Sequence, residues 1–306
     1  MRRCRVAFVL MIAGGVLLAN RPAFPQGPQI AGAGRWETVV RGVEYAHVVR
    51  GDPRPLQIHV LRIDLREPGL LPVVDVAADP DGNGPAEAVL VAPLVHAERG
   101  GFVAAVNGNA WAMVPPPAEG RQPRYVAGAD CDICGWVVID GEQRSSPSAG
   151  FWSFWMDAER RVHIGSVAEP KAGAVWAIAG FGGLLHSGKV LPRPSDVRHP
   201  RTAAGIDRDG TVLMLVVVDG RQPGYSEGMS ERELAELMLE LGCSDALNLD
   251  GGGSTVMILG NAAVKQRIAN RPSDVSGPRP IPVLFGVRLA PGADTGESRS
   301  GRSTQD

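Results

Sequence analysis

The chain has 306 residues, of which 44% are hydrophobic and 21% charged, and its formal net charge is -2. This apolar fraction is enough for a full hydrophobic core, which argues against an intrinsically disordered chain. With 31 Lys and Arg against 33 Asp and Glu, the chain lacks the positive charge that nonspecific nucleic-acid binding requires, so no nucleic-acid partner is expected.

Residues 1–26 have the pattern of a secretory signal peptide. Several arginines at the start are followed by an apolar run from Val6 to Ala19 and then by a polar, proline-rich stretch. The alternative is a membrane anchor, but the run is shorter than the roughly 20 residues that a spanning helix needs. We therefore expect a secreted or periplasmic protein that is not inserted in the membrane after cleavage.

Short apolar runs predict strands in much of the chain that follows. Three such runs between Trp36 and Ala78 are separated by Asp-Pro, Pro and Pro-Gly turn signals. Residues 85–99 have mixed helical spacing and predict a helix, and the run GFVAAV predicts a buried strand after it. The Pro- and Gly-rich stretch from Ala110 to Tyr125 predicts a long surface loop. Beyond it, CGWVVIDG, FWSFWMD and RVHIGSV predict further antiparallel strands.

The cysteines predict one local crosslink. Cys131 and Cys134 have CxxC spacing, and in an oxidising compartment this close pair is expected to form a disulfide, whereas Cys243 is expected to be buried. A zinc site would need a second pair of ligands at suitable spacing, and the six histidines show none. No cofactor is predicted, although scattered Asp and carbonyl groups leave calcium open.

The most regular pattern lies between residues 201 and 259. TVLMLVVV is a continuous apolar run of the kind found in a strand covered on both faces. A helix follows, with Ser230 as its N-cap, Glu233 completing a capping box and Gly242 ending it. DALNL and STVMIL then predict strands on either side of a triglycine.

These elements together predict an α+β fold, with a mixed β-sheet core and a few helices. One strand-helix-strand crossover precedes the LDGGGS loop. The predicted domain spans residues 35–290. The polar, aperiodic tail of residues 291–306 is expected to be disordered.

The strand-helix-strand unit predicts a functional rim. If both strands belong to one sheet, they are parallel and their carboxyl ends share an edge. Asp219 follows the first strand and Asp250 the second, and α/β sheets commonly bind ligands at this edge. Asn107, which follows GFVAAV, would join the rim if its strand is parallel as well.

The residue types on this rim suit phosphate and sugar chemistry. The triglycine after Asp250 would let backbone N–H groups approach one oxyanion, although a simple tight turn is the alternative. Arg201 would clamp a phosphate, or it could be an ordinary surface arginine. Two carboxylates can cleave a glycosidic bond. A phosphate leaving group needs less protonation than a sugar alkoxide because its second pKa is near 6, so one acid and one Arg would be enough.

Other candidates have plain structural alternatives. Asn107 and Asn109 in the NGN sequence could form a turn or could bind sugar hydroxyls. The S-x-x-E sequence makes Glu233 a helix-capping residue in its own right. Any of three tryptophans could stack on a sugar, although core packing is more typical of each: Trp111, Trp152 and Trp155.

The ordered motifs resemble those of the phosphodiester glycosidase family. Between Val43 and Arg288 they are HVLRIDL, AAVNGNAW, GGLLHSGKV, HPRTAAGIDRDG, LVVVDGR, MSERELAELMLELG, DALNLDGGGST, NRPSD and GPRP. The resemblance implies an exported hydrolase that cleaves a sugar from a sugar-1-phosphodiester, a small molecule or a polymer, in cell-envelope or exopolysaccharide material.

The resemblance also implies the site residues. The catalytic pocket would contain Asp250, Asp219, Arg201, Asn107 and Glu233, and the substrate would contact Gly108, Asn109, Arg221, Gly251, Gly252, Gly253 and Ser254. Asp250 would be the nucleophile or base, Arg201 would bind the phosphate and Asn107 the sugar hydroxyls. The proton would come from Asp219 or Glu233, and the assignment among the three acids stays open.

Two departures from the family pattern bear on the sugar that is accepted. NGNAW replaces the usual NGG followed by aromatic residues, and the Pro-rich stretch of residues 110–130 carries Arg121 and Arg124 near the expected entrance. Two other functions stay open: a noncatalytic polysaccharide-binding protein of the same fold, and a metal-assisted phosphodiesterase that breaks the P–O bond. The sequence gives no oligomeric state.

Overall fold

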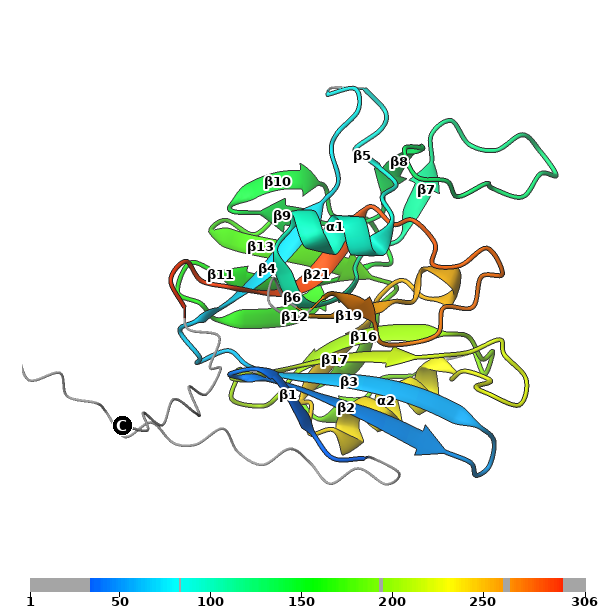
Figure 1. Cartoon of the computed structure of the whole chain (residues 1–306). Helices are drawn as coiled ribbons and strands as arrows, with labels where there is room; N and C mark the ends of the chain where they lie inside the picture. Colours follow the sequence, from blue (N-terminus) through cyan, green and yellow to red (C-terminus); the bar gives the residue numbers. More distant parts are fainter. Residues whose placement is uncertain (1–33, 83, 193–194, 261–264, 294–306) are drawn as a thin grey trace, which may run out of the picture.

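The computed structural model describes residues 34–82, 84–192, 195–260 and 265–293 (Figure 1). The predicted signal peptide and residues 294–306 of the predicted tail lie outside these ranges. The described chain is mostly strand. It has two α-helices, α1 (Pro93–Arg99) and α2 (Glu231–Glu240), and a short 3-10 turn, η1 (Gly252–Ser254). Neither helix is long and apolar enough to cross a membrane. The predicted sheet-rich fold with few helices is confirmed.

The strands of the described residues form four sheets. The largest has eight strands, in the order β1 (Glu37–Val40), β2 (Val43–Arg50), β3 (Leu56–Asp64), β17 (Val212–Val218), β16 (Arg201–Ile206), β18 (Asp245–Asn248), β14 (Gly183–His186) and β15 (Lys189–Val190). One five-stranded sheet has the order β20 (Arg267–Ile268), β19 (Met257–Leu259), β6 (Phe102–Asn107), β21 (Val283–Leu289) and β4 (Leu70–Val76).

The two other sheets are formed by the middle of the chain. The second five-stranded sheet has the order β10 (Glu142–Ser145), β9 (Val137–Ile139), β13 (Ala174–Gly180), β11 (Trp152–Asp157) and β12 (Val162–Ser166). A three-stranded sheet consists of β5 (Ala88–Val89), β8 (Asp130–Ile133) and β7 (Trp111–Met113). The predicted surface loop contains β7, and the rest of it extends away from the sheets between β7 and β8 (Figure 1).

Neighbouring strands in the described residues pair antiparallel, so the predicted mixed sheet is wrong. The two strands that flank α2, β17 and β18, run in the same direction, but they do not pair with each other. Instead β16 lies between them and pairs antiparallel with both. The strand β16, which precedes β17 in the sequence, thus lies between β17 and β18. No local sequence pattern predicts this insertion.

The predicted helix over residues 85–99 is half as long as expected. Residues 88–89 form β5, and α1 begins only at Pro93, which occupies its first turn. Proline fits a first helical turn because the N–H that it lacks has no helical partner there. The residue before a proline is driven out of the helical region, so Pro93 starts the helix and does not interrupt it.

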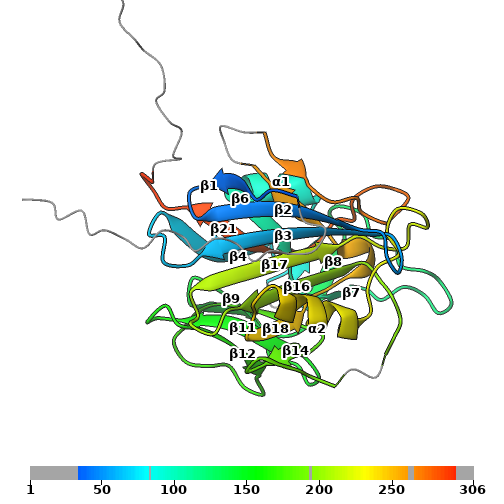
Figure 2. The same ribbon diagram turned by 90° about the horizontal axis from the view of Figure 1, so that it is seen from below.

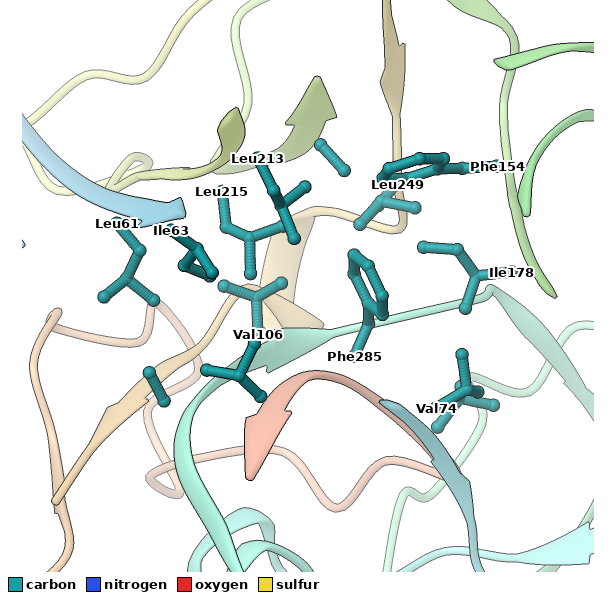
Figure 3. Close-up of a cluster of buried hydrophobic side chains, with 14 of the residues drawn as sticks. Leu61, Ile63, Val74, Val106, Phe154, Ile178, Leu213, Leu215, Leu249 and Phe285 are labelled. Carbon is teal, nitrogen blue, oxygen red and sulfur yellow. The ribbon is translucent and has the colours of Figure 1, made fainter. Parts of the chain in front are cut away.

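A shared hydrophobic core joins the sheets. Its residues come from the eight-stranded sheet and from both five-stranded sheets, and they include Leu61, Val106, Phe154, Ile178, Leu213 and Phe285 (Figure 3). The strand β17 is buried along its whole length. Leu213, Leu215 and Val217 face this core, and the alternate residues, such as Val216, face the side of the sheet that α2 covers.

The helix α2 lies across that second face of the eight-stranded sheet (Figure 2). It buries Leu234, Leu237 and Met238 against the sheet. The predicted capping box is present, since the Ser230 hydroxyl accepts from the Glu233 amide at 3.2 Å and the Glu233 carboxylate accepts from the Ser230 amide at 2.8 Å. The helix ends at Glu240, with Leu241 as its C-cap, and Gly242 follows with a left-handed φ of 86°, so the predicted stop at Gly242 is confirmed.

The predicted disulfide between Cys131 and Cys134 is absent, because both residues are free thiols. Cys131 lies in β8, where successive side chains point to opposite faces. Two positions three residues apart on such a strand face away from each other, which is unsuited to the short Cβ–Cβ distance of a disulfide. Cys243 is buried, as expected.

We predict that Ser230→Ala lowers the free energy of unfolding by about 1 kcal/mol, because it removes the side-chain acceptor of the capping box. Chemical denaturation followed by circular dichroism measures this change. Ser148→Ala, at an exposed position, is the control and should change stability by less than about 0.5 kcal/mol. Equal stability of Ser230→Ala and wild type would contradict the capping role.

Candidate active site

A pocket of about 230 Å³ opens at one edge of the eight-stranded sheet. The carboxyl ends of β17 and β18 and the amino end of β16 meet there, since Arg201 pairs with Val218 and Ala203 pairs with Asn248. The pocket is lined by Phe181, His199, Pro200, Arg201, Arg221, Asn248, Leu249, Asp250, Gly251, Gly252, Gly253 and Arg279.

The backbone of Asp250 is held from the neighbouring sheet. Its N–H donates to the Gly108 carbonyl at 3.3 Å, and its carbonyl accepts from the Asn107 amide at 2.7 Å. Asn107 is the last residue of β6, in the five-stranded sheet that also contains β19 and β21, and Gly108 follows it. These two contacts position the main chain of Asp250, and its carboxylate also interacts with the Ser254 side chain and the Gly251 amide.

The triglycine lets other groups approach this loop closely. A β-carbon at Gly251 would lie 2.7 Å from the Pro200 carbonyl oxygen, and one at Gly253 would overlap the ion pair of Arg279 and Asp274. Gly252 has a φ of 62°, which favours glycine. The Gly252 N–H donates to the Pro200 carbonyl at 2.9 Å, so this amide is used within the protein and is not directed at a substrate.

Asp250 is the carboxylate among the lining residues. Burial raises its pKa from the ordinary value of 3.8 to about 6, while Ser254, the Gly251 amide and Arg279 act in the opposite direction. A carboxyl group with a pKa near 6 is ionised for the most part at neutral pH, yet it is more basic than an exposed aspartate. Such a group suits a nucleophile or a general base.

Three arginines line the same pocket as this carboxylate, and Arg279 is the one whose charge lowers the Asp250 pKa. Arg221 is exposed and sits against Gly252, where its Nη1 would be 3.1 Å from an added β-carbon. Arg279 is held by Asp274 through contacts of 2.8 and 3.1 Å. Its guanidinium also lies 4.2 Å from the ring centre of Tyr125, in the loop between β7 and β8. That loop therefore reaches the pocket wall.

Arg201 is the most strongly anchored of the three. Its Nε donates to the Met229 carbonyl and its Nη2 to the Val197 carbonyl, both at 2.9 Å. Its Nη1 lies 3.5 Å from a Glu231 carboxylate oxygen. These contacts engage all three guanidinium nitrogen atoms of Arg201, so this residue adds positive charge to the pocket. Arg221 and Arg279 are better placed to contact an anion directly.

His199 lines the pocket beside Arg221, and the pKa of its imidazole lies below the ordinary value, which favours the neutral form. Burial lowers its pKa, and Arg221 and Arg201 lower it further. The Arg221 Nη2 lies 3.1 Å from His199 Nδ1, and because a guanidinium only donates, Nδ1 is the acceptor and the proton is on Nε2. His199 therefore offers an N–H donor to the pocket.

The structure brings part of the predicted site together and leaves part of it outside. Six predicted residues line the pocket: Arg201, Arg221, Asp250, Gly251, Gly252 and Gly253. Asn107 contacts Asp250, but it is only 1% exposed, and its Oδ1 accepts from Thr202 at 2.7 Å and from the Val256 amide at 3.1 Å. It therefore supports the loop from behind, in place of the expected contact with sugar hydroxyls.

The neighbours of Asn107 and Asp250 also lie behind the pocket. Gly108 packs against Val283. Asn109 is 1% exposed, donating to the Cys134 carbonyl at 3.0 Å and accepting from the Ala179 amide at 3.0 Å. Ser254 is buried directly after the triglycine. These residues shape the wall from inside and do not face the cavity.

Asp219 lies at the predicted edge, but its side chain turns away from the pocket. Its carboxylate accepts from the Asn270 amide at 2.9 Å, from the Arg271 backbone at 3.0 Å and from the Tyr225 hydroxyl at 3.3 Å. The Nε2 atom of His59 lies 3.6 Å from the Asp219 carboxylate. Because Asn270 also donates to the Thr255 carbonyl, Asp219 ties the segment after β20 to the end of the triglycine loop.

Glu233 also serves the scaffold. Besides the capping box, its carboxylate accepts from Arg54 at 2.7 Å. Burial alone would raise its pKa, but the Ser230 amide and Arg54 lower it below the ordinary value. A stabilised carboxylate that does not line the pocket is a poor proton donor to a substrate there.

Sequence reasoning missed six residues that line the pocket: Phe181, His199, Pro200, Asn248, Leu249 and Arg279. Two had a signal in the sequence. Asn248 lies two residues before Asp250, so an extended chain places both on one face, and His199 is two residues before the predicted Arg201. Phe181 and Arg279 come from distant turns, and only the tertiary fold brings them in.

No group of three or more His, Cys, Asp or Glu side chains in the described ranges is arranged to hold a metal ion. The three tryptophans for which core packing was the more typical expectation do not line this pocket. Trp111 contacts Tyr125 edge to face, Trp152 contacts His186 edge to face, and Trp155 stacks on His163.

Comparisons with known proteins show the family to which this chain belongs. The family model for phosphodiester glycosidases matches residues 100–288, and the chain belongs to this family. That segment contains every residue that lines the pocket.

Two curated relatives match a short part of the chain. An uncharacterized SPbeta prophage-derived protein of Bacillus subtilis, YomE, is 40% identical over 79 residues, which is 26% of this chain and 11% of YomE. The bovine N-acetylglucosamine-1-phosphodiester alpha-N-acetylglucosaminidase is 40% identical over 74 residues, 24% of this chain and 12% of the bovine protein. The matches thus span only a small fraction of these relatives.

Solved structures share the fold over most of the chain. The catalytic domain of the zebrafish N-acetylglucosamine-1-phosphodiester alpha-N-acetylglucosaminidase, auto-inhibited by its pro-peptide, superposes with a TM-score of 0.59 at 20% identity, covering 85% of this chain and 87% of that one. A hypothetical protein from Synechocystis has a TM-score of 0.54 at 15% identity, covering 82% and 62%. At these identities the likeness concerns the fold alone.

We predict that Asp250→Asn stabilises the protein at alkaline pH. A carboxyl group whose pKa rises on folding from 3.8 to about 6 contributes stability that is present below the unfolded value and is lost as the pH rises through about 6. The amide removes that loss. At about pH 8 the variant should be more stable than wild type by about 1–2 kcal/mol, after allowance for solvent screening in an open pocket.

At about pH 4 the gain should nearly vanish, because the folded wild type is then mostly protonated as well. Denaturant titrations of both proteins at the two pH values measure the difference. A variant that is less stable than wild type at the higher pH would show that the folded protein favours the ionised carboxylate.

Proposed function

We propose that this protein is an exported hydrolase that cleaves the bond between a sugar and the phosphate of a phosphodiester. The observation that carries the proposal is the pocket itself, in which the carboxylate of Asp250 lies among Arg201, Arg221 and Arg279. Membership of the phosphodiester glycosidase family supports the same chemistry. The apolar N-terminal run supports export, and cell-envelope or exopolysaccharide material is the proposed source of substrate.

In the proposed reaction, Asp250 acts on the anomeric carbon. It either attacks that carbon directly or removes a proton from a water molecule that attacks it. The bond from the anomeric carbon to the phosphate oxygen breaks, and its electron pair leaves with the phosphate. Water supplies the new hydroxyl of the sugar, and the other product is a phosphate monoester.

The cationic groups explain why a second carboxylic acid is not required. A phosphate monoester has its second pKa near 6, so it can leave as an anion without full protonation. Arg221 and Arg279 would bind its oxygen atoms, and the Nε2–H of His199 would add a neutral donor. The earlier assignment of the proton to Asp219 or Glu233 is therefore replaced by electrostatic stabilisation of the leaving group.

The bovine relative's name describes an enzyme for N-acetylglucosamine-1-phosphodiesters, and we propose the same class of bond for this chain with the sugar left open. A metal-assisted phosphodiesterase would break the P–O bond instead. A noncatalytic binding protein would hold the same substrate without releasing product. A labelling experiment together with a binding assay separates all three.

We predict that hydrolysis in oxygen-18 water puts the label into the sugar, because the anomeric carbon is the atom attacked. Mass spectrometry of both products of a sugar-1-phosphodiester gives the result. Label in the phosphate would support attack at phosphorus. The absence of products from a full panel of sugar phosphodiesters, despite saturable binding, would support the noncatalytic protein.

We predict that Asp250→Asn lowers kcat/KM by about 1,000-fold or more while the protein stays folded. For the wild type, kcat/KM should rise with pH through about 6, because Asp250 acts in its ionised form. Leu239→Ala, at an exposed position on α2, is the matched control and should retain wild-type kinetics. Undiminished turnover by folded Asp250→Asn would remove Asp250 from the mechanism.

A further inference from the structure

Phe181 is an aromatic side chain in a pocket otherwise dominated by charge. It is 47% exposed and lines the same cavity as Asp250. Behind it, the Phe151 ring lies 5.4 Å away between centroids, tilted by 35°. A half-exposed aromatic ring that is supported from behind is a feature of ligand-binding surfaces.

The backbone fixes Phe181 beside the end of β18. The Phe181 N–H donates to the Asn248 carbonyl at 2.7 Å, and the Asn248 N–H donates to the Gly182 carbonyl at 3.0 Å. Asn248 itself is only 2% exposed, and its Oδ1 has no hydrogen-bond partner within the described part of the chain. Buried amide oxygens nearly always accept a hydrogen bond, so we expect the Asn248 Oδ1 atom to accept one from a bound ligand.

The chemistry of the pocket changes in order along residues 248–253. Phe181 lies beside Asn248, at the start of this segment. The carboxylate of Asp250 comes next. At the other end, Arg221 packs against Gly252 and Arg279 against Gly253. The pocket therefore runs from an aromatic end, past a carboxylate, to a cationic end.

A sugar phosphodiester has the same order of groups. Its pyranose ring has an apolar face of C–H groups, its anomeric carbon comes next, and its phosphate carries the charge. With the phosphate at the arginines and the anomeric carbon at Asp250, the ring extends toward Phe181. The alternative direction would place the anionic phosphate against an aromatic face, which carries partial negative charge.

We propose that Phe181 is the platform on which the sugar ring stacks and that Asn248 accepts a hydrogen bond from a hydroxyl or amide N–H of that sugar. This inference rests on the proposed function, since it takes the substrate to be a sugar phosphodiester. It makes Phe181 and Asn248 the specificity-determining residues of the site, and it assigns no part of sugar binding to the tryptophans that the sequence suggested.

The test uses the full chain and the methyl phosphodiesters of glucose, mannose, galactose and N-acetylglucosamine 1-phosphate. Phe181→Ala should raise KM for the preferred substrate about tenfold and change kcat by less than about threefold, because uniform binding is lost. Phe181→Tyr, which keeps the aromatic face, should retain a KM within about threefold of wild type. Asn248→Ser should reduce the discrimination among the four sugars.

Inorganic phosphate is the probe that separates the two ends of the pocket. As a competitive inhibitor it should bind Phe181→Ala as tightly as wild type, whereas Arg221→Ala should weaken it about tenfold. Leu239→Ala again serves as the unaffected control. An unchanged KM in Phe181→Ala, or a loss of phosphate affinity equal to the loss for the sugar substrates, would overturn the inference.

Binding of the free sugars tests this inference separately from the proposed function, because it does not depend on turnover. If the wild type hydrolyses none of the four substrates, the proposed function fails, and saturation-transfer NMR with the four free sugars then tests Phe181 by itself. The inference survives if the wild type and Arg221→Ala bind a sugar that Phe181→Ala does not. It falls if the wild type binds no sugar, or if Phe181→Ala binds as the wild type does.

Discussion

The hydrogen bond between the Asn107 side chain and the Asp250 carbonyl is the contact on which the pocket depends. Asn107 ends a strand of one sheet, and Asp250 follows a strand of another. The amide oxygen of Asn107 also binds Thr202 and Val256, so this buried side chain links three segments. A buried polar group that loses its partners costs about 1–3 kcal/mol, which makes any other position of the loop unfavourable.

This arrangement separates support from chemistry. Asp219 and Asn107 are polar residues near this edge of the sheet. Their side chains bind neighbouring loops and do not face the pocket. The main chain of Asp250 is held by hydrogen bonds at the end of β6, and burial raises the pKa of its carboxylate. Positive charge is supplied by side chains that are anchored elsewhere, such as Arg279 by Asp274. The reacting group and its supports thus come from different residues, as preorganised sites require.

The sequence predicts the local elements well and the tertiary placement less well. β17, β6 and α2 follow from continuous apolar runs and a capping box, which are local patterns. That Asp219 and Asp250 come at one edge also follows. The direction of the Asp219 side chain does not, because it depends on Asn270 and Arg271, about 50 residues further along the chain. The insertion of β16 is equally nonlocal, and it turns an expected mixed sheet into an antiparallel one.

A crystal structure of Asp250→Asn with an uncleaved sugar phosphodiester would test the central claim most directly. The account predicts phosphate oxygens within hydrogen-bonding distance of Arg221 or Arg279, and the anomeric carbon beside residue 250. A ligand in the opposite direction, or one bound away from residues 248–253, would contradict it.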